Sequence, residues 1–305
     1  MDQHLREQMR EHFADLSNEE VLGQLGNQKT IRILEETLGD DILPELNGLK
    51  ARDLDLGEKL TADDVTKYFP GVKQSVDTLL DVDGSTPNVW IQTFSDKDYI
   101  KYLAQMTILG GGMMGYLGTA ICTLDFTPSL EALAVGESIA MSLGALSTLF
   151  GSPNFYDPNK ENISLVKSNV ARARGVMAHE YVHRVQDVVG IPFGGKHTYL
   201  SEGMAENVRD IVGKDFEDAD DSLRYENLRS RFHNMQNAYR LLAKSLGSKV
   251  KKDLIQRGQP WVQPFEKMYA YGTAFCHIQE REQGQDFYRK LTNRAKQQLA
   301  TIPSR

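Results

Sequence analysis

Two histidines in this chain are four residues apart, and a glutamate directly follows the first of them. If the segment His179-Glu180-Tyr181-Val182-His183 is helical, both imidazoles lie on one face, because residues four apart are stacked there. After eighteen further residues the chain carries Glu202. Zinc at a hydrolytic site takes three protein ligands and leaves one position for water. A second helix that brings Glu202 to His179 and His183 would complete this ligand set, with Glu180 at its edge.

The residues around this segment predict one long helix. Ser168 is a suitable N-cap, and Gly190 is a natural residue just beyond a helix C-terminus. In the alternative interpretation, two core histidines are satisfied by backbone carbonyls, and no carboxylate is then required at the spacing of Glu202. Between the two ends, apolar residues recur at helical spacing and form a stripe that we expect to be buried: Val170, Ala173, Met177, Ala178, Val182, Val185 and Val189.

This pattern resembles the gluzincin metallopeptidases, which include thermolysin and the aminopeptidase N-type enzymes. The spacing to Glu202 is the same, and Glu202-Gly203-Met204-Ala205 is similar to the Glu-Gly-x-Ala of the aminopeptidases. Tyr269-Ala270-Tyr271-Gly272 resembles the Tyr-x-x-Gly stretch that carries their transition-state tyrosine, which by this match is Tyr269. The resemblance spans about residues 150 to 290. The chain lacks the Gly-x-Met-Glu-Asn stretch that binds a substrate's free amino group in the aminopeptidases.

The resemblance implies a zinc-dependent peptidase whose substrate is a peptide or a protein. Zinc acts as a Lewis acid and lowers the pKa of its bound water. Glu180 would then be the general base that takes a proton from this water. Tyr269 would stabilise the oxyanion of the tetrahedral intermediate, whereas Tyr271 points elsewhere on a helix. In the alternative interpretation, both tyrosines belong to an aromatic core stripe with Phe265 and Phe275.

A further acid is expected behind the metal ligands. The second nitrogen of a metal-binding histidine is usually held by a carboxylate. Glu206 lies one turn after Glu202, where thermolysin-like enzymes carry such an acid. Asp187, one turn after His183, is the alternative, and either residue could instead be an ordinary surface acid.

Composition and charge exclude several other classes of protein. The 305-residue chain has 25% charged and 40% hydrophobic residues, which is ordinary for a globular protein, and its formal net charge of −7 argues against a nucleic-acid surface. Residues 1–7 contain no apolar core of a signal peptide. Cys122 and Cys276 are too few and too far apart for a disulfide framework. We therefore expect a cytoplasmic protein, and the oligomeric state has no signature in the sequence.

One long uncharged run requires a separate interpretation. Residues 102–124 contain no charged side chain and pass the length test for a membrane span, and a second uncharged run covers residues 138–156. Five glycines, Gln105 and three threonines dilute the apolar character of the first run, so we expect it to be buried in protein and not in lipid. A membrane-associated zinc protease remains the alternative if both runs are true spans.

The predicted fold class is α+β and predominantly helical. We expect a gluzincin-like peptidase domain over residues 85–305, with a small sheet and the metal helix. An N-terminal helical region over residues 1–84 would precede it as a prodomain or regulatory domain, and the turn-rich residues 81–87 mark the boundary. A further alternative is a protein that descends from a peptidase and binds zinc without catalysis. Loss of activity in such proteins usually involves loss of the general base, and this chain retains Glu180.

Caps and periodicity predict the individual elements. In the N-terminal region, helices are expected to begin at Ser17, Asn27 and Thr61. In the second region we expect a strand over residues 88–94, and a hairpin that pairs residues 154–156 with residues 163–166. The remaining predicted helices cover residues 95–106, 222–246, 265–282 and 287–299.

Overall fold

The structure is a computed structural model, and it confirms a predominantly helical chain with a small three-stranded sheet. The residues that it describes are 16–50, 60–82, 90–94, 155–157, 161–166, 170–192, 195–217, 221–255, 262 and 264–301. Within these ranges the elements are α2 (Asn18–Leu25), α3 (Gln28–Glu36), the π-helical η1 (Thr37–Ile42), α4 (Leu43–Lys50), α5 (Ala62–Leu80), β1 (Trp90–Phe94), β2 (Phe155–Asp157), β3 (Asn162–Val166), α8 (Val170–Val189), η2 (Gly195–His197), α9 (Thr198–Glu217), α10 (Asp221–Ser245), η3 (Lys252–Leu254), α11 (Pro264–Gln283) and α12 (Asp286–Thr301).

The chain is divided into two compact units. One unit comprises Met1–Ile91, Tyr156–Ile163 and Asn169–Arg305, and the other comprises Gln92–Phe155 and Ser164–Ser168. All the candidate site residues belong to the first unit. This unit also contains the N-terminal helices, whereas the sequence analysis places a domain boundary near residue 84.

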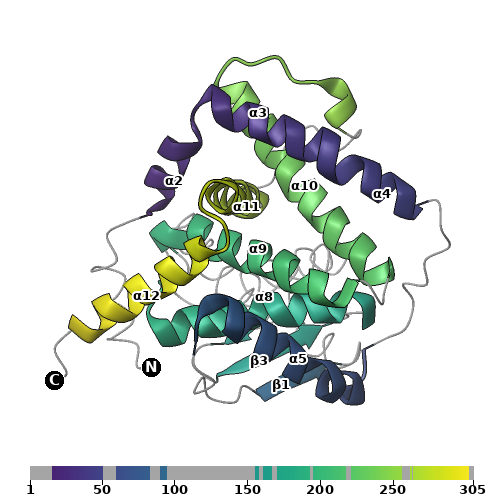
Figure 1. Cartoon of the computed structure of the whole chain (residues 1–305), viewed down its shortest axis with the longest axis vertical. Coiled ribbons are helices and arrows are strands. Elements are labelled where there is room, and N and C mark those ends of the chain that lie inside the picture. The colour runs from purple at the N-terminus through teal and green to yellow at the C-terminus, as the bar shows by residue number, and fades with distance from the viewer. Residues whose placement is uncertain are drawn as a thin grey trace, which may run out of the picture. The chain divides into compact units, whose positions relative to one another are not determined.

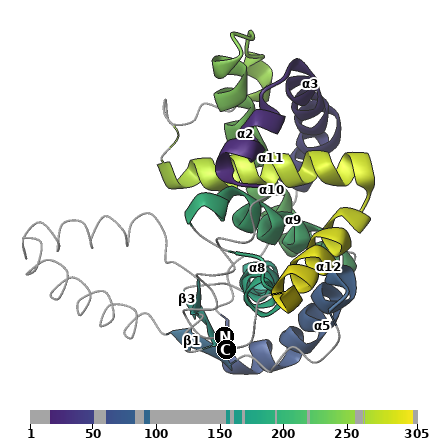
Figure 2. The same cartoon turned by 90° about the vertical axis from the view of Figure 1, so that its left-hand side faces the viewer.

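Helix α9 is the centre of the first unit. It packs against α8 on one side and α11 on the other, and α10 contacts all three helices (Figure 1). On the outside, α5 covers α8, while α3 and α4 contact α10 (Figure 2). The predicted apolar stripe of α8 is buried between these neighbours, and its described members, Ala173, Met177, Ala178, Val182, Val185 and Val189, are at most 2% exposed.

The predicted helix starts are confirmed. Ser17 and Glu20 form a capping box at α2, and Thr61 and Asp64 form another at α5. The side chain of Asn27 accepts from the backbone N–H of Thr30 at the start of α3. These caps satisfy backbone N–H groups that have no partner within the helix. The predicted C-terminal helices correspond to α10, α11 and α12.

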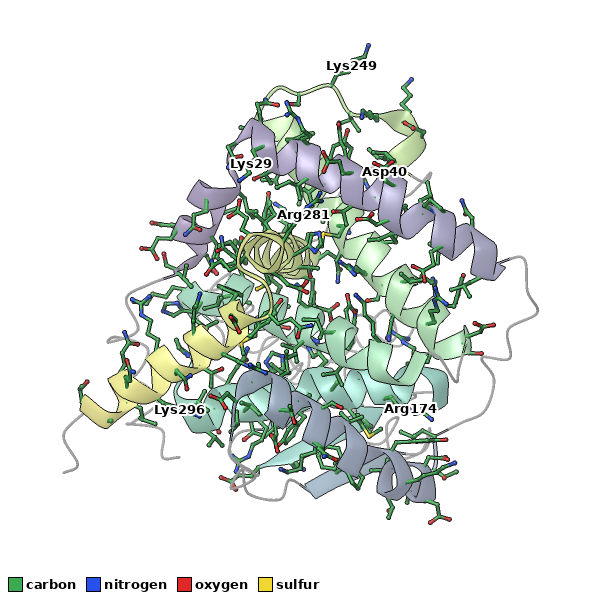
Figure 3. The ribbon with its side chains drawn as sticks, viewed as in Figure 1. Lys29, Asp40, Arg174, Lys249, Arg281 and Lys296 are labelled. Atoms are coloured by element: carbon green, nitrogen blue, oxygen red, sulfur yellow. The ribbon has the colours of Figure 1, made fainter. Side chains whose placement is uncertain are left out.

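The N-terminal helices are joined to α8, α9 and α11 by buried and by exposed contacts. The Asn18 side chain accepts from the backbone N–H of Tyr199 at 2.9 Å and so satisfies a donor in the first turn of α9. The Tyr181 hydroxyl donates to Asp77 of α5 at 2.9 Å. Lys29 and Arg281, both labelled in Figure 3, take part in ion pairs between α3 and α11, which contribute little because they are exposed.

The small sheet has the strand order β1-β3-β2. β2 and β3 pair as the predicted hairpin, and β1 confirms the predicted strand over residues 90–94. Residues 88 and 89 of that prediction lie outside the described residues. The predicted helix 95–106, the uncharged run 102–124 and most of the run 138–156 lie outside the described residues. Within the described ranges, no helix combines the length and the apolarity that a membrane crossing requires.

Helices α9 and α11 cross with two glycines at the point of contact. A Cβ built on Gly203 would lie 2.1 Å from the carbonyl oxygen of Gly272, and one built on Gly272 would lie 2.1 Å from that of Tyr199. Asn207 joins the two backbones, because its side-chain amide donates to Gly203 O at 2.9 Å and to Thr273 O at 3.1 Å. The backbone approach therefore leaves no room for a side chain at either glycine.

We predict that Gly272→Ala destabilises the protein. The added methyl group must push two backbones apart, and overpacking of this kind costs about 1 to 3 kcal/mol or more. Gly23→Ala is the matched control, because nothing lies within 4 Å of a Cβ at this helical glycine. Alanine there should stabilise the helix by about 0.5 to 1 kcal/mol. Urea unfolding of both variants measures the difference, and an unchanged midpoint for Gly272→Ala would contradict the tight crossing.

Candidate metal centre

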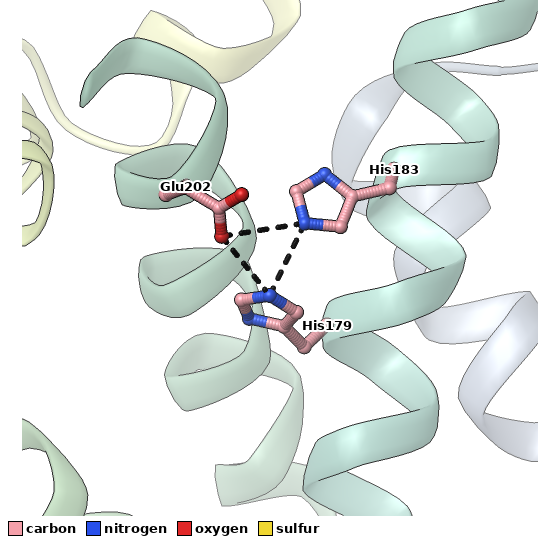
Figure 4. A group of neighbouring side chains, drawn as sticks. All are labelled: His179, His183 and Glu202. Carbon is pink, nitrogen blue, oxygen red and sulfur yellow. Dashed lines mark hydrogen bonds and ion pairs between the residues drawn. The ribbon is translucent and has the colours of Figure 1, made fainter. Parts of the chain in front are cut away.

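Three side chains from two helices converge on one point. His179 and His183 extend from α8, and Glu202 faces them from α9 (Figure 4). The two Nε2 atoms are 3.2 Å apart, and Glu202 Oε2 lies 3.4 Å from that of His179 and 3.5 Å from that of His183. Among the described residues this set is the one group whose ligand atoms could hold a metal ion. The structure thus brings together the three ligands that the sequence predicted.

The spacing of these atoms fits a tetrahedral metal ion. Zn–N and Zn–O bonds of about 2.0 to 2.1 Å at tetrahedral angles separate neighbouring ligand atoms by about 3.3 to 3.4 Å. The observed separations of 3.2, 3.4 and 3.5 Å bracket that value. Glu202 Oε2 is also buried without a hydrogen-bond partner. A cation between the three atoms would give this oxygen the partner that a buried carboxylate requires.

His183 is oriented by Gln186, a residue that the sequence analysis missed. His183 Nδ1 lies 2.9 Å from Gln186 Oε1. The Gln186 amide nitrogen in turn donates to the carbonyl oxygen of Ser201 at 3.0 Å, which directs Oε1 toward the histidine. With Nδ1–H donating to Gln186, the lone pair of Nε2 is available to a metal. Gln186 is three residues after His183, and this helical spacing is its only signal in the sequence.

His179 is held by Glu206, one of the two predicted acids. Its Nδ1 lies 2.9 Å from Glu206 Oε1. Asp187, the alternative, instead accepts from the Tyr156 hydroxyl at 3.0 Å and lies 3.6 Å from Arg184. Both acids are buried, so neither is an ordinary surface residue. The structure therefore brings one of the two acids to a candidate metal ligand, His179, and the other to Tyr156 and Arg184.

The electrostatics of the site favour a bound cation. Burial lowers the pKa of His179, but its contacts with Glu202 and Glu206 outweigh burial and raise it to about 10. Burial raises the pKa of Glu202, but the two imidazoles outweigh burial and hold it well below its ordinary value. The carboxylates thus favour positive charge at the point where the imidazoles and Glu202 meet. A metal ion would supply that charge with both histidines neutral, the form in which histidine binds metal.

Glu180 is placed to act as a base beside the ligands. Its side chain is buried and interacts electrostatically with His179, His183 and Glu202. Burial raises its pKa, while the histidine charges and a hydrogen bond from the backbone N–H of Tyr156 lower it, and the net shift is upward. A raised carboxyl pKa brings the group closer to the range in which a general base works at neutral pH.

Tyr269 faces the ligands, and Tyr271 does not. The Tyr269 ring centroid is 6.2 Å from that of His179, and the phenol is close enough to Glu202 for that carboxylate to raise its pKa. Burial and the charges of Glu202, Glu206 and Glu180 raise the pKa of Tyr269 well above its ordinary value, so the phenol keeps its proton. Tyr271 lies against Tyr199, with ring centroids 5.4 Å apart. The two tyrosines therefore do not share one aromatic core stripe.

Comparisons of the chain with protein families, with curated proteins and with solved structures found no match.

Proposed function

We propose that this chain is a zinc-dependent peptidase with a gluzincin-type catalytic domain. The observation that carries the proposal is the meeting of His179, His183 and Glu202 at tetrahedral spacing, with Glu180 and Tyr269 beside them. Two imidazoles, one carboxylate and an open fourth position are typical of catalytic zinc. Binding without catalysis would need neither the buried carboxylate of Glu180 nor the phenol of Tyr269.

In this proposal each side chain has one task. Zinc would supply a Lewis acid and a bound water with a lowered pKa. Glu180 accepts a proton from the attacking water on its carboxylate and later delivers it to the departing amine. Tyr269, which keeps its proton, donates a hydrogen bond from Oη to the oxyanion of the tetrahedral intermediate. Glu206 and Gln186 hold the two imidazoles in the orientation that metal binding needs.

The proposed substrate is an extended peptide. β2 is an outer strand of the described sheet, and extended peptides add to exposed sheet edges through backbone hydrogen bonds. The backbone N–H of Tyr156 in β2 hydrogen-bonds Glu180, so this strand runs next to the proposed base. Digestion of a mixed peptide library, followed by mass spectrometry, tests the activity. Cleavage that zinc restores after chelation supports the proposal, and metal-loaded protein without cleavage supports a non-catalytic zinc protein.

We predict that each chain binds one zinc ion and that the His183→Ala variant does not retain it. Removing one of three protein ligands leaves too few donors for a stable site. Elemental analysis of protein purified without added metal measures the stoichiometry. His233→Ala is the matched control, because His233 is exposed on α10 and contacts Glu266 and Asn237, not the metal ligands. Full metal retention in His183→Ala would refute the assignment of the site.

A further inference from the structure

Glu206 is held at both carboxylate oxygens by buried donors. Its Oε1 contacts His179 Nδ1 at 2.9 Å and accepts from Arg209 Nη1 at 2.9 Å. Its Oε2 accepts from the side-chain amide of Asn234 on α10 at 2.8 Å. Glu206, Arg209 and Asn234 are each at most 8% exposed. The carboxylate that orients His179 therefore has its own fixed position.

Arg209 is itself fixed on three sides. Its Nε and Nη2 both donate to Asp210 Oδ1, at 3.1 and 2.9 Å, which leaves Nη1 directed at Glu206. Its aliphatic stem occupies the space next to Gly175 of α8. A Cβ on Gly175 would lie 3.3 Å from Arg209 Cδ and 3.0 Å from Asn227 Oδ1. A glycine within a helix costs about 0.5 to 1 kcal/mol relative to alanine, and here it makes room for the guanidinium stem.

We propose that Arg209 is a positioning residue of the metal centre, which acts on His179 through Glu206. This inference rests on the proposed function, because it presupposes that His179 binds metal. Without Arg209, the bond from Asn234 would still hold Oε2, but Oε1 would have no donor besides the histidine. The carboxylate could then turn about the Asn234 contact, and the imidazole bound to Oε1 would move with it. The planar guanidinium, anchored by Asp210, restricts that motion because its donors have a fixed geometry.

The alternative is that Arg209 merely neutralises buried negative charge. Arg231 on α10 offers a matched comparison. Its Nε lies 4.0 Å from Asp210 Oδ2, and its Nη2 lies 3.1 Å from His277 Nδ1, so it belongs to the same charged cluster. Neither of these contacts involves Glu206. Loss of either arginine removes one positive charge from the cluster, but loss of Arg209 also removes a bond to the carboxylate that holds His179.

The experiment compares zinc affinity in wild type, Arg209→Met and Arg231→Met, measured by competition with a chromophoric chelator. Loss of a residue that supports a metal ligand weakens metal binding about 10- to 100-fold, and we expect that loss in Arg209→Met alone. The cobalt(II)-substituted protein supplies a second measurement, because its visible absorption spectrum reports ligand geometry. We expect this spectrum to shift in Arg209→Met and to stay unchanged in Arg231→Met.

Arg209→Lys keeps the test decisive if Arg209→Met does not fold. Lysine retains the charge but not the planar fork, so positioning predicts weaker zinc binding and an altered cobalt spectrum. Wild-type affinity and spectrum in folded Arg209→Lys would overturn the proposal, as would equal losses in Arg209→Met and Arg231→Met. Absence of metal from the wild-type protein is a different result, because it would reject the metal centre itself.

Discussion

Glu180→Gln should abolish most peptide hydrolysis and leave the metal in place. Glutamine keeps the shape of the side chain and can still accept the hydrogen bond from Tyr156, but it cannot take a proton from water. Removal of a general base typically lowers the rate about 10²- to 10⁴-fold. Turnover of a cleaved library peptide and zinc content, measured on the same preparation, test both halves of this prediction.

Glu226→Gln is the control for this substitution. Glu226 is also a largely buried glutamate, with a side chain 11% exposed, but its ion-pair partners are Arg172 and Arg229. Its amide variant should hydrolyse peptides at the wild-type rate. Equal activity in Glu180→Gln and wild type would remove Glu180 from the mechanism. Loss of zinc from Glu180→Gln would instead mean that this carboxylate supports the metal.

Tyr269→Phe should lower kcat about 10²- to 10³-fold, the usual effect of losing one oxyanion donor. KM should change little, because the interaction forms in the transition state and not in the bound substrate. The Tyr269 phenol also interacts with Glu202, so the variant must be assayed for zinc as well as for turnover. Low kcat with full zinc content indicates oxyanion stabilisation, whereas loss of zinc indicates that the phenol only supports the ligand.

Tyr271→Phe is the matched control on the same helix. Its ring packs against Tyr199, and its phenyl body remains after the substitution, so kcat should be nearly unchanged. A damaging Tyr271→Phe with a silent Tyr269→Phe would mean that the catalytic role had been assigned to the wrong tyrosine of α11. If both variants were fully active, the proposal would rest on the metal ligands and Glu180 alone.

The local features of this protein could be read from its sequence. Hydrophobic periodicity predicted the buried face of α8, and Gly190 with φ of 92° ends the helix as expected. Ser168, the predicted N-cap, lies outside the described residues. Capping residues predicted the starts of α2, α3 and α5. The proximity of His179 and His183 could also be predicted, because a spacing of four residues fixes two imidazoles on one face of a helix.

Contacts between distant helices were decided only by the tertiary structure. Periodicity shows which face of a helix is buried, but it does not show which residue of another helix lies opposite. For this reason the sequence did not indicate that Arg209 and Asn234 hold Glu206, the acid that contacts His179. Only the structure shows that Glu206, and not Asp187, contacts His179. The same holds for Gly203 and Gly272, which meet although they are distant in sequence.

The N-terminal helices illustrate the same limit. Turn-forming residues at 81–87 indicate a local change of direction, and such residues do not reveal whether the segments on either side pack together. In the structure, Asn18 satisfies a backbone N–H at the start of α9, and Asp77 accepts from Tyr181, which lies between His179 and His183 on α8. The starts of α2, α3 and α5 and the two histidines on one face of α8 could be predicted, because both depend on spacing within one segment of the chain. Tertiary packing decided what holds the ligands in place, because that depends on which helix faces meet.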